Sequence, residues 1–199
     1  MTEEKDRLRK RLIHRRKELS EQQRKEAGAA AEELLCSLPV WKEAGQVFAY
    51  CDCSGEMPTG GILRRALKEG KVLALPKVAG PGKMDFFQVG DISELKPGAY
   101  GILEPEPLRP VFPDAGTILL LPGTAFDENG YRLGYGGGFY DRYTSRYPEG
   151  IRIGLGYSFQ LLQTIPHEDW DIRADGLVTE DEVRFFAKRK GCKMPAIPV

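Results

Sequence analysis

"TILLLPGTAFDENGYRLGYGGGFYDR", residues 117–142, joins a short apolar run to a glycine-rich segment. Because residues 117–121 show no polar alternation, they predict a strand that is buried on both faces and lies centrally in a sheet. In open α/β sheets, ligands bind at the carboxyl ends of the strands, and the glycine-rich segment begins at that end. The stretch therefore predicts the middle of the fold and, directly after it, a ligand site.

Helix-like and strand-like segments alternate along the rest of the chain. The spacing of apolar residues predicts helices over 3–17, 20–35 and 60–69, the second opened by a capping box of Ser20 and Gln23 and the third capped by Thr59. Short apolar runs predict strands over 46–51, 71–75, 84–89, 151–157 and 176–179. This alternation is typical of βαβ units, so we expect an α/β fold: an open, mainly parallel sheet flanked by helices in a Rossmann-like three-layer architecture. Residues 90–116, rich in Pro and Gly, are expected to form an ordered loop over the sheet, where binding residues are common.

Length and composition favour one globular domain. With 199 residues, 41% of them hydrophobic, the chain is long enough for a sizeable core. We expect a single α/β domain over residues 1–187 and a flexible C-terminal tail over residues 188–199. No apolar run approaches the ~20 residues that a membrane-spanning helix needs, and the first residues are too charged for a secretory signal. The four cysteines show no disulfide or zinc pattern, so we expect reduced thiols and a cytoplasmic protein that does not contact membranes.

Charge is balanced overall but unevenly distributed. Lys plus Arg, 29 residues, equals Asp plus Glu, 29 residues, so no global field attracts nucleic acid or an anionic membrane. Residues 1–17, in contrast, hold eight Lys and Arg against three acidic residues. The N-terminus is thus a positive arm on a slightly acidic body, and any anion site has to be local.

The glycines of residues 134–138 would allow backbone N–H groups to approach an anion closely. The segment that follows has a helical pattern, which would offer a helix N-terminus to phosphate, and Arg132 and Arg142 add positive charge. The alternative is a glycine-rich turn that only reverses a strand. Known nucleotide-binding patterns do not decide between the two, because Phe139 and Phe159 stand where G-x-G-x-x-G requires its last glycine. The sequence also contains no G-x-x-x-x-G-K-[ST] pattern.

Acidic residues near the predicted site each have two interpretations. Asp141 directly follows the glycine-rich segment, where a carboxylate beside phosphate suits magnesium; a salt bridge to an arginine explains it equally well. Residues 168–175 form a second acidic cluster just before a predicted strand, and such charge runs are more often solvated surfaces. Glu56 is either part of a site at the same sheet edge or an acid that favours the start of a helix.

Residues 119–142 carry a specific resemblance through the spacing of PG, FD, RLG, GxG and YD. Weaker matches lie at 5–20, 55–59, 76–77, 101–105 and 169–180. On these motifs the chain resembles the 5-formyltetrahydrofolate cyclo-ligase family, also called methenyltetrahydrofolate synthetases. The resemblance implies an open α/β sheet flanked by helices. It also implies an ATP- and magnesium-dependent ligase that converts 5-formyltetrahydrofolate to 5,10-methenyltetrahydrofolate, releasing ADP and phosphate, through phosphorylation of the formyl oxygen.

The resemblance further implies roles for single residues. Arg132 and Tyr140 would be catalytic, and Asp141 and Asp171 would hold magnesium, with Asp175 open as an alternative to Asp171. The folate-binding residues would be Cys51, Glu56, Phe139 and Tyr140. The ATP-binding residues would be Lys5, Arg9, Arg132, Leu133, Gly134, Tyr135, Gly136, Gly137, Gly138, Phe139 and Tyr140. The implied partner is a small-molecule folate, bound by a monomer that contacts neither nucleic acid nor membrane.

Two other function classes stay open at this point. The basic helix over residues 3–17 is compatible with a nucleic-acid-binding protein, although overall neutrality and the lack of a recognised motif disfavour it. A sugar-phosphate isomerase or a nucleotide-binding regulator could use a similar α/β frame. Consumption of ATP in the presence of 5-formyltetrahydrofolate separates both from a ligase.

Overall fold

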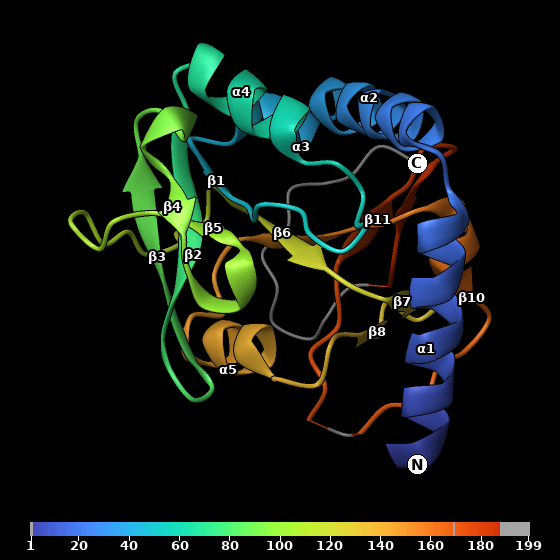
Figure 1. Ribbon diagram of the computed structural model, residues 1–199. Helices are drawn as coiled ribbons and strands as arrows, with labels where there is room; N and C mark the ends of the chain where they lie inside the picture. Colours follow the sequence, from blue (N-terminus) through green and yellow to red (C-terminus); the bar gives the residue numbers. More distant parts are fainter. Residues whose placement is uncertain (1, 169, 188–199) are drawn as a thin grey trace.

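A seven-stranded sheet forms the centre of the molecule, in the order β12-β11-β9-β6-β1-β2-β3 (Figure 1). The structure is a computed structural model, and it describes residues 2–168 and 170–187. As residues 117–121 predict, β6 occupies the middle position of the sheet. The strands are β1 (Gln46–Phe48), β2 (Val72–Gly80), β3 (Lys83–Val89), β6 (Thr117–Pro122), β9 (Ile151–Leu155), β11 (Gly176–Val178) and β12 (Val183–Phe185).

The sheet is mainly parallel, as expected. β2, β1, β6, β9 and β11 pair in parallel, with Val47 opposite Ile118 and Leu120 opposite Ile153. The two edge strands, β3 and β12, run antiparallel to their neighbours. Every residue of β6 from Thr117 to Leu121 is buried, which explains why this strand lacks polar alternation.

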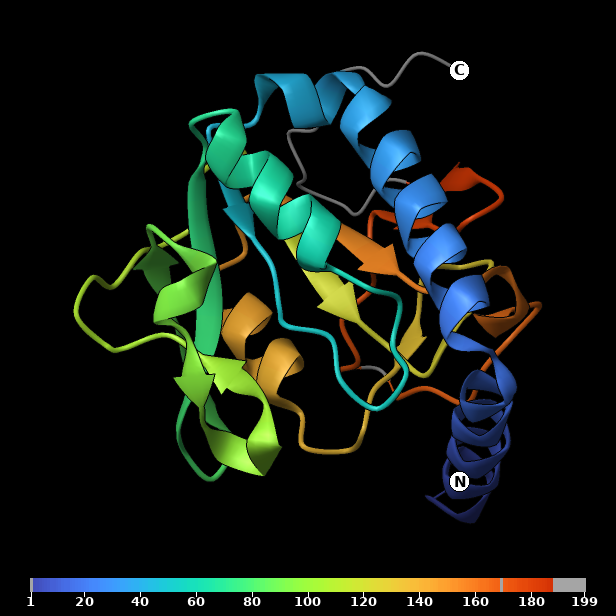
Figure 2. The ribbon, with the colours of Figure 1, turned by 45° about the horizontal axis from the view of Figure 1, so that its top comes forward.

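Helices cover both faces of the sheet and give the expected three layers (Figures 1 and 2). On one face, Ala31, Leu35 and Ile62 pack in a cluster with Val47 and Ile118 of the sheet. On the other face, Tyr143 packs in a cluster with Phe48, Phe86, Leu119 and Leu121. The helices are α1 (Thr2–Glu18), α2 (Glu21–Ser37), α3 (Pro39–Glu43), α4 (Gly60–Lys68) and α5 (Phe139–Arg146).

The predicted helix caps have different outcomes. Ser20 and Gln23 form the capping box at the start of α2: Gln23 N donates to Ser20 Oγ over 3.1 Å, and Ser20 N donates to Gln23 Oε1 over 2.9 Å. Thr59 is the N-cap residue of α4, as predicted, but its side chain forms no capping hydrogen bond. Its hydroxyl instead donates to the Tyr50 carbonyl over 2.7 Å. This hydrogen bond ties the segment after β1 to the start of the helix.

Several small elements differ from the sequence-based expectations. β1 ends at Phe48 rather than residue 51, and the short helix α3, which begins at Pro39, was not predicted. Residues 90–116 are ordered, as expected, but contain a small antiparallel pair that the loop assignment missed. The paired strands are β4 (Lys96–Pro97) and β5 (Leu103–Glu104). The same segment holds two short 3-10 helices, η1 (Ile92–Glu94) and η2 (Ala99–Gly101).

A second sheet of three strands was also not predicted, and it lies beside α1 (Figure 1). Leu12 of α1 packs with Ala125, Leu133 and Ile165 around this sheet. Its strands are β7 (Ala125–Asp127), β8 (Arg132–Leu133) and β10 (Leu161–Leu162), and η3 (Ser158–Gln160) leads into the last of them. This small sheet fixes α1 next to the glycine-rich segment.

Two expectations concern the extent and surroundings of the chain. The tail predicted over residues 188–199 lies outside the described residues, so the domain boundary at residue 187 stays a prediction. Among the residues that the structure describes, we find no helix with the length and apolar character needed to cross a membrane.

Candidate active site

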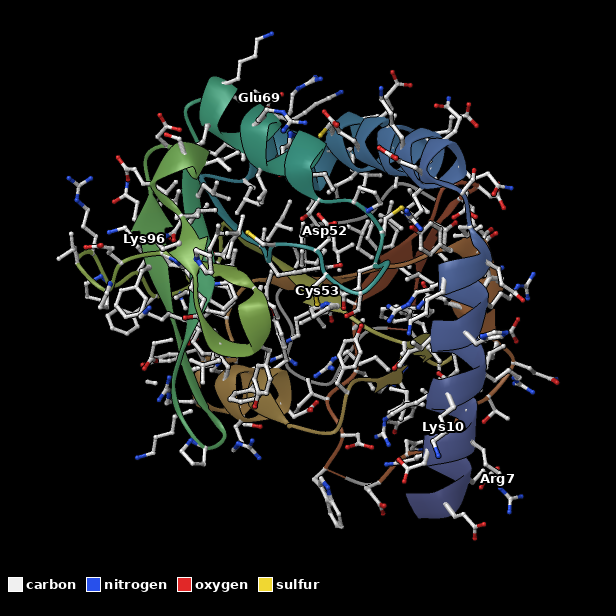
Figure 3. All side chains as sticks on the ribbon, viewed as in Figure 1. Arg7, Lys10, Asp52, Cys53, Glu69 and Lys96 are labelled. Atoms are coloured by element: carbon white, nitrogen blue, oxygen red, sulfur yellow. The ribbon has the colours of Figure 1, made fainter. Side chains whose placement is uncertain are left out.

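A cavity of about 1030 Å³ opens at the carboxyl ends of β1 and β6. It lies between α1, the segment after β1, the β4–β5 hairpin and α5, and Figure 3 shows Cys53 in the middle of this region. All site residues expected from the sequence line this one cavity, although they come from four distant parts of the chain. They are Lys5, Arg9, Cys51, Glu56, residues 132–140, Asp141 and Asp171.

The glycine-rich segment forms the loop between β8 and α5. Gly136 has a φ of +97° and Gly138, the cap residue of α5, has a φ of +62°, conformations that residues with a side chain rarely adopt. A Cβ atom on Gly136 would have only the Arg9 guanidinium near it, at 3.8 Å, so the backbone here borders open space. The loop thus offers accessible main chain next to the start of a helix, a combination suited to an anion.

Two cations of α1 line the cavity, and one of them contacts this loop. Arg9 Nε donates to the Gly134 carbonyl over 2.8 Å, and Lys5 Nζ donates to Asp171 Oδ2 over 3.1 Å. Arg7 and Lys10, labelled in Figure 3, lie on the exposed side of the same helix. The positive arm of the sequence is therefore divided into a cavity-facing row and a solvent-facing row.

Both carboxylates expected to hold magnesium are ion-paired with cations of the cavity. Arg132 Nη2 donates to Asp141 Oδ1 over 2.8 Å, so the salt bridge that the sequence left as an alternative does form. Asp171 accepts from Lys5, whereas Asp175 is buried away from the cavity and accepts from the Arg152 backbone N–H over 2.8 Å. Of the two candidates, Asp171 is the one that borders the cavity.

The donor set fits magnesium only in combination with a phosphate. Within the described part of the chain, no three His, Cys, Asp or Glu side chains gather into a metal-binding group. Magnesium, however, is commonly held by one or two carboxylates together with substrate phosphates and waters. Asp141, in the first turn of α5 and beside the glycine loop, has the position that such a shared site requires.

The guanidinium of Arg132 has an N–H group that is not hydrogen-bonded within the described part of the chain. Its guanidinium is almost buried, its carbon lies 5.6 Å from the centre of the Tyr140 ring, and its Nε has no hydrogen-bond partner among the described residues. A buried N–H without a partner is costly. The arginine is therefore well suited to bind an anionic group that enters the cavity.

Glu56 forms part of the cavity wall and is 5% exposed. Burial raises the pKa of this carboxyl, while the Cys53 N–H, which donates to Oε2 over 3.1 Å, and the charge of Arg16 lower it. Burial also raises the pKa of Tyr140, so this phenol stays protonated at neutral pH. The wall thus combines a buried acceptor with an aromatic ring that carries a neutral hydroxyl.

The thiols of the cavity are poor nucleophiles. Burial raises the pKa of Cys51 to about 11 and that of Cys53 to about 11. Because the thiolate is the reactive form, both side chains act as small apolar groups near neutral pH. This arrangement favours chemistry in which the substrates react with each other rather than with a cysteine.

The structure adds residues that sequence reasoning missed. Tyr100, 83% exposed, and Trp170, 73% exposed, stand at the rim of the cavity. The Pro- and Gly-rich composition of residues 90–116 indicated a binding loop, but it did not indicate which side chains would face the site. The additional lining residues include Tyr50, Ser54, Val78, Met84, Tyr100, Ile102, Glu104 and Trp170.

Comparison with known proteins agrees with this geometry. Residues 1–180 match the model of the 5-formyltetrahydrofolate cyclo-ligase family. The 5-formyltetrahydrofolate cyclo-ligase of Escherichia coli K12 is 33% identical over 178 residues, which cover 86% of this chain and 98% of that protein.

One solved structure gives the same assignment, and a second shows the same fold. The 5,10-methenyltetrahydrofolate synthetase of Aquifex aeolicus superimposes with a TM-score of 0.82 and 38% identity, covering 96% of each chain. A 5,10-methenyltetrahydrofolate synthetase from Mycoplasma pneumoniae shares the fold, with a TM-score of 0.71 and 22% identity over 88% of this chain and 98% of the other. The resemblance read from residues 119–142 is confirmed: the chain belongs to the 5-formyltetrahydrofolate cyclo-ligase family and is an enzyme of the ligase class.

Proposed function

We propose that this protein uses ATP and magnesium to convert 5-formyltetrahydrofolate to 5,10-methenyltetrahydrofolate, with release of ADP and phosphate. One observation carries the proposal: a single cavity brings together cations, a glycine loop, aromatic rings and a buried carboxylate. Family membership supports the folate conversion. We further propose that the enzyme acts in the cytoplasm as a monomer on a small-molecule folate.

ATP would bind along the glycine loop and α1. Lys5, Arg9 and Arg132 supply positive charge within this part of the cavity, and the backbone around Gly136 is accessible. Phosphoryl transfer depends mainly on positioning and on neutralisation of charge, which these groups provide. The assignment extends to the loop residues Leu133, Gly134, Tyr135, Gly137, Gly138, Phe139 and Tyr140, all of which border the cavity.

The folate would bind against Cys51, Glu56, Phe139 and Tyr140. A pterin is a flat heterocycle that stacks on aromatic rings while its polar edge forms hydrogen bonds. Glu56 offers the acceptor for that edge, and Tyr140 offers both a ring and a hydroxyl. Phe139 lacks a hydroxyl, so Tyr140 is the aromatic residue of this pair that takes part in polar contacts.

The chemistry follows from the weakness of an amide oxygen as a leaving group. The formyl oxygen attacks the γ-phosphorus of ATP, and the bond to the bridging oxygen breaks as ADP leaves. The neighbouring anilino nitrogen then attacks the activated formyl carbon, loses its proton and expels phosphate. Arg132 stabilises the transferring phosphoryl group, and the loop and Tyr140 hold the two reactants in contact.

Asp141 and Asp171 would hold magnesium, which neutralises charge on the phosphate oxygens when bound. Their present partners, Arg132 and Lys5, are cations that would then contact phosphate directly. Exchange of these ion pairs for phosphate contacts keeps every charged group paired during nucleotide binding.

The test is to mix the purified protein with ATP, magnesium and 5-formyltetrahydrofolate and to follow the absorbance of the methenyl product together with free phosphate. We expect both products in equal amounts, and neither when ATP or magnesium is omitted. ATP hydrolysis without the methenyl product, or the methenyl product without ATP, would overturn the proposal.

A further inference from the structure

Arg16 of α1 is completely buried, with 0% of its surface exposed. It lies behind the cavity wall rather than in it: its backbone carbonyl and Cβ lie near Gly55, on the segment that carries Glu56. A buried arginine is rare unless its charge has a function or a partner. None of the roles described above uses this residue.

Among the residues that the structure describes, no carboxylate forms a direct ion pair with Arg16. Its Nη2 donates to the Tyr135 hydroxyl over 2.5 Å, and its guanidinium carbon lies 5.6 Å from the centre of the Tyr135 ring. Its Nε and Nη1 have no hydrogen-bond partner in the part of the chain that is described. The field of this cation therefore acts on its surroundings without being cancelled by an adjacent carboxylate.

The surroundings on which it acts include Glu56. Arg16 and the Tyr135 hydroxyl both favour the charged form of the Glu56 carboxyl, against the effect of burial. Tyr135 thus links α1 to the cavity wall: it accepts from Arg16 and stabilises Glu56. This arrangement connects the glycine loop with the carboxylate assigned to folate.

We propose that Arg16 is a positioning residue that acts through Tyr135 to keep Glu56 oriented and negatively charged for folate binding. The inference rests on the proposed function, because it takes Glu56 as the acceptor for the pterin edge. A charged acceptor binds N–H groups more strongly than a neutral one, so the state of Glu56 controls affinity for folate but not for ATP.

Other groups that face Glu56 also influence whether its carboxyl is protonated or charged, and they come from several elements. Cys53 donates from its backbone to the carboxylate, and its thiol is nearby. The phenols of Tyr50 and Tyr140 would disfavour the negative charge of Glu56 only if they were ionised themselves. Burial raises the pKa of both, so they stay neutral. The titratable groups around Glu56 are Arg16 on α1, Tyr50 and Cys53 on the segment after β1, Tyr135 on the glycine loop and Tyr140 on α5.

The experiment measures kcat/KM for 5-formyltetrahydrofolate from pH 5 to pH 9, at saturating magnesium and ATP. In the wild type, protonation of Glu56 at low pH weakens folate binding and produces an acid limb. Arg16→Met removes the cation, so the carboxyl protonates at a higher pH and the limb moves upward. We expect the KM for folate near the acid limb to rise by roughly tenfold or more relative to wild type, with little change at pH 9 and no change in the KM for ATP.

Matched variants separate charge from packing. Arg16→Lys keeps the cation and should leave the limb close to its wild-type position. Arg16→Gln is neutral but polar; it should shift the limb as Met does, and it carries the test if Met impairs folding, as judged by thermal unfolding. Arg15→Met removes a cation from the exposed side of the same helix, where Arg15 covers the Phe159 ring, and should reproduce the wild-type profile.

Either of two results in a folded neutral variant of Arg16 would overturn the inference: an acid limb that stays at the wild-type position, or a kcat/KM that falls equally at every pH. The limb must also vanish in Glu56→Gln; if it persists there, another group titrates and the role given to Arg16 is wrong. Failure of the proposed function looks different, because the wild-type enzyme itself would then form no methenyl product.

Discussion

Arg132 Nη2 lies 2.8 Å from Asp141 Oδ1, so the residue that opens β8 and a residue in the first turn of α5 are ion-paired. This contact closes the glycine loop at its base and leaves residues 134–138 between two fixed ends. The candidate phosphate-binding cation and the candidate magnesium ligand therefore control each other's position. Mutations on the two sides of the pair should nevertheless have different kinetic effects, because each residue has its own proposed partner.

Asp141→Asn should mainly impair the use of magnesium. An amide keeps the shape of the side chain but removes its negative charge, so we expect the magnesium concentration that gives half-maximal rate to rise by roughly tenfold or more. Titration of the metal at saturating ATP and folate measures this. Asp85→Asn is the control, since Asp85 pairs with Arg146 near the end of α5 and does not line the cavity. Equal magnesium dependence in the two variants would remove Asp141 from the metal site.

Arg132→Ala should lower kcat, because a preorganised donor to the transferring phosphoryl group is lost. Loss of one such donor costs on the order of 100- to 1000-fold in rate. Arg132→Lys should rescue little, since an ammonium group does not reproduce the planar guanidinium. Arg173→Ala serves as control, because Arg173 donates to the Asn129 carbonyl outside the cavity. A kcat for Arg132→Ala within a few-fold of wild type would contradict the catalytic assignment.

Gly136→Ala should reduce activity far more than stability. Gly136 has a φ of +97° and Gly70 a φ of +72°, and a Cβ on Gly70 would have no atom within 4 Å. Alanine at either position adds backbone strain, so each variant should lose about 1 kcal/mol of unfolding free energy in urea titrations. Only Gly136→Ala should also raise the KM for ATP, because its methyl group enters the space next to the loop. Matching KM values for ATP in both variants would argue against phosphate binding at Gly136.

Lys5→Ala should weaken ATP binding with little effect on folate. Hydrogen bonds to charged groups contribute about 1.5–3 kcal/mol, so the KM for ATP should rise roughly tenfold or more. Lys10→Ala, on the exposed side of the same helix (Figure 3), should leave both KM values unchanged. If the two lysine variants behave alike, α1 contributes a general positive field rather than a specific contact.

The centre of the fold could be predicted because its signals are local. Residues 117–121 are uniformly apolar, and Ser20 with Gln23 form a capping box within one helical turn. The small three-stranded sheet gave no such signal, since its strands have two or three residues and pair over long distances, as Leu161 does with Phe126. Strands that short show no periodicity, and tertiary packing alone decides that they form.

The site was predictable to the extent that its residues lie together in the sequence or match a family motif. Arg132 and Asp141 flank the glycine loop within ten positions, and the motif spacing identified both. Arg16 could not be singled out, because a helix rich in arginine does not reveal which cation becomes buried. The difference between exposed Arg15 and buried Arg16 arises only when α1 packs against the segment after β1 and the glycine loop.

Isotope transfer tests the proposed phosphorylation of the formyl oxygen most directly. The enzyme is supplied with ATP, magnesium and 5-formyltetrahydrofolate whose formyl oxygen is ¹⁸O, and the released phosphate is analysed by mass spectrometry. We expect one ¹⁸O atom in each phosphate, because the formyl oxygen attacks phosphorus and leaves with it. Methenyl product accompanied by unlabelled phosphate would contradict this step, since water rather than the formyl oxygen would then have attacked ATP.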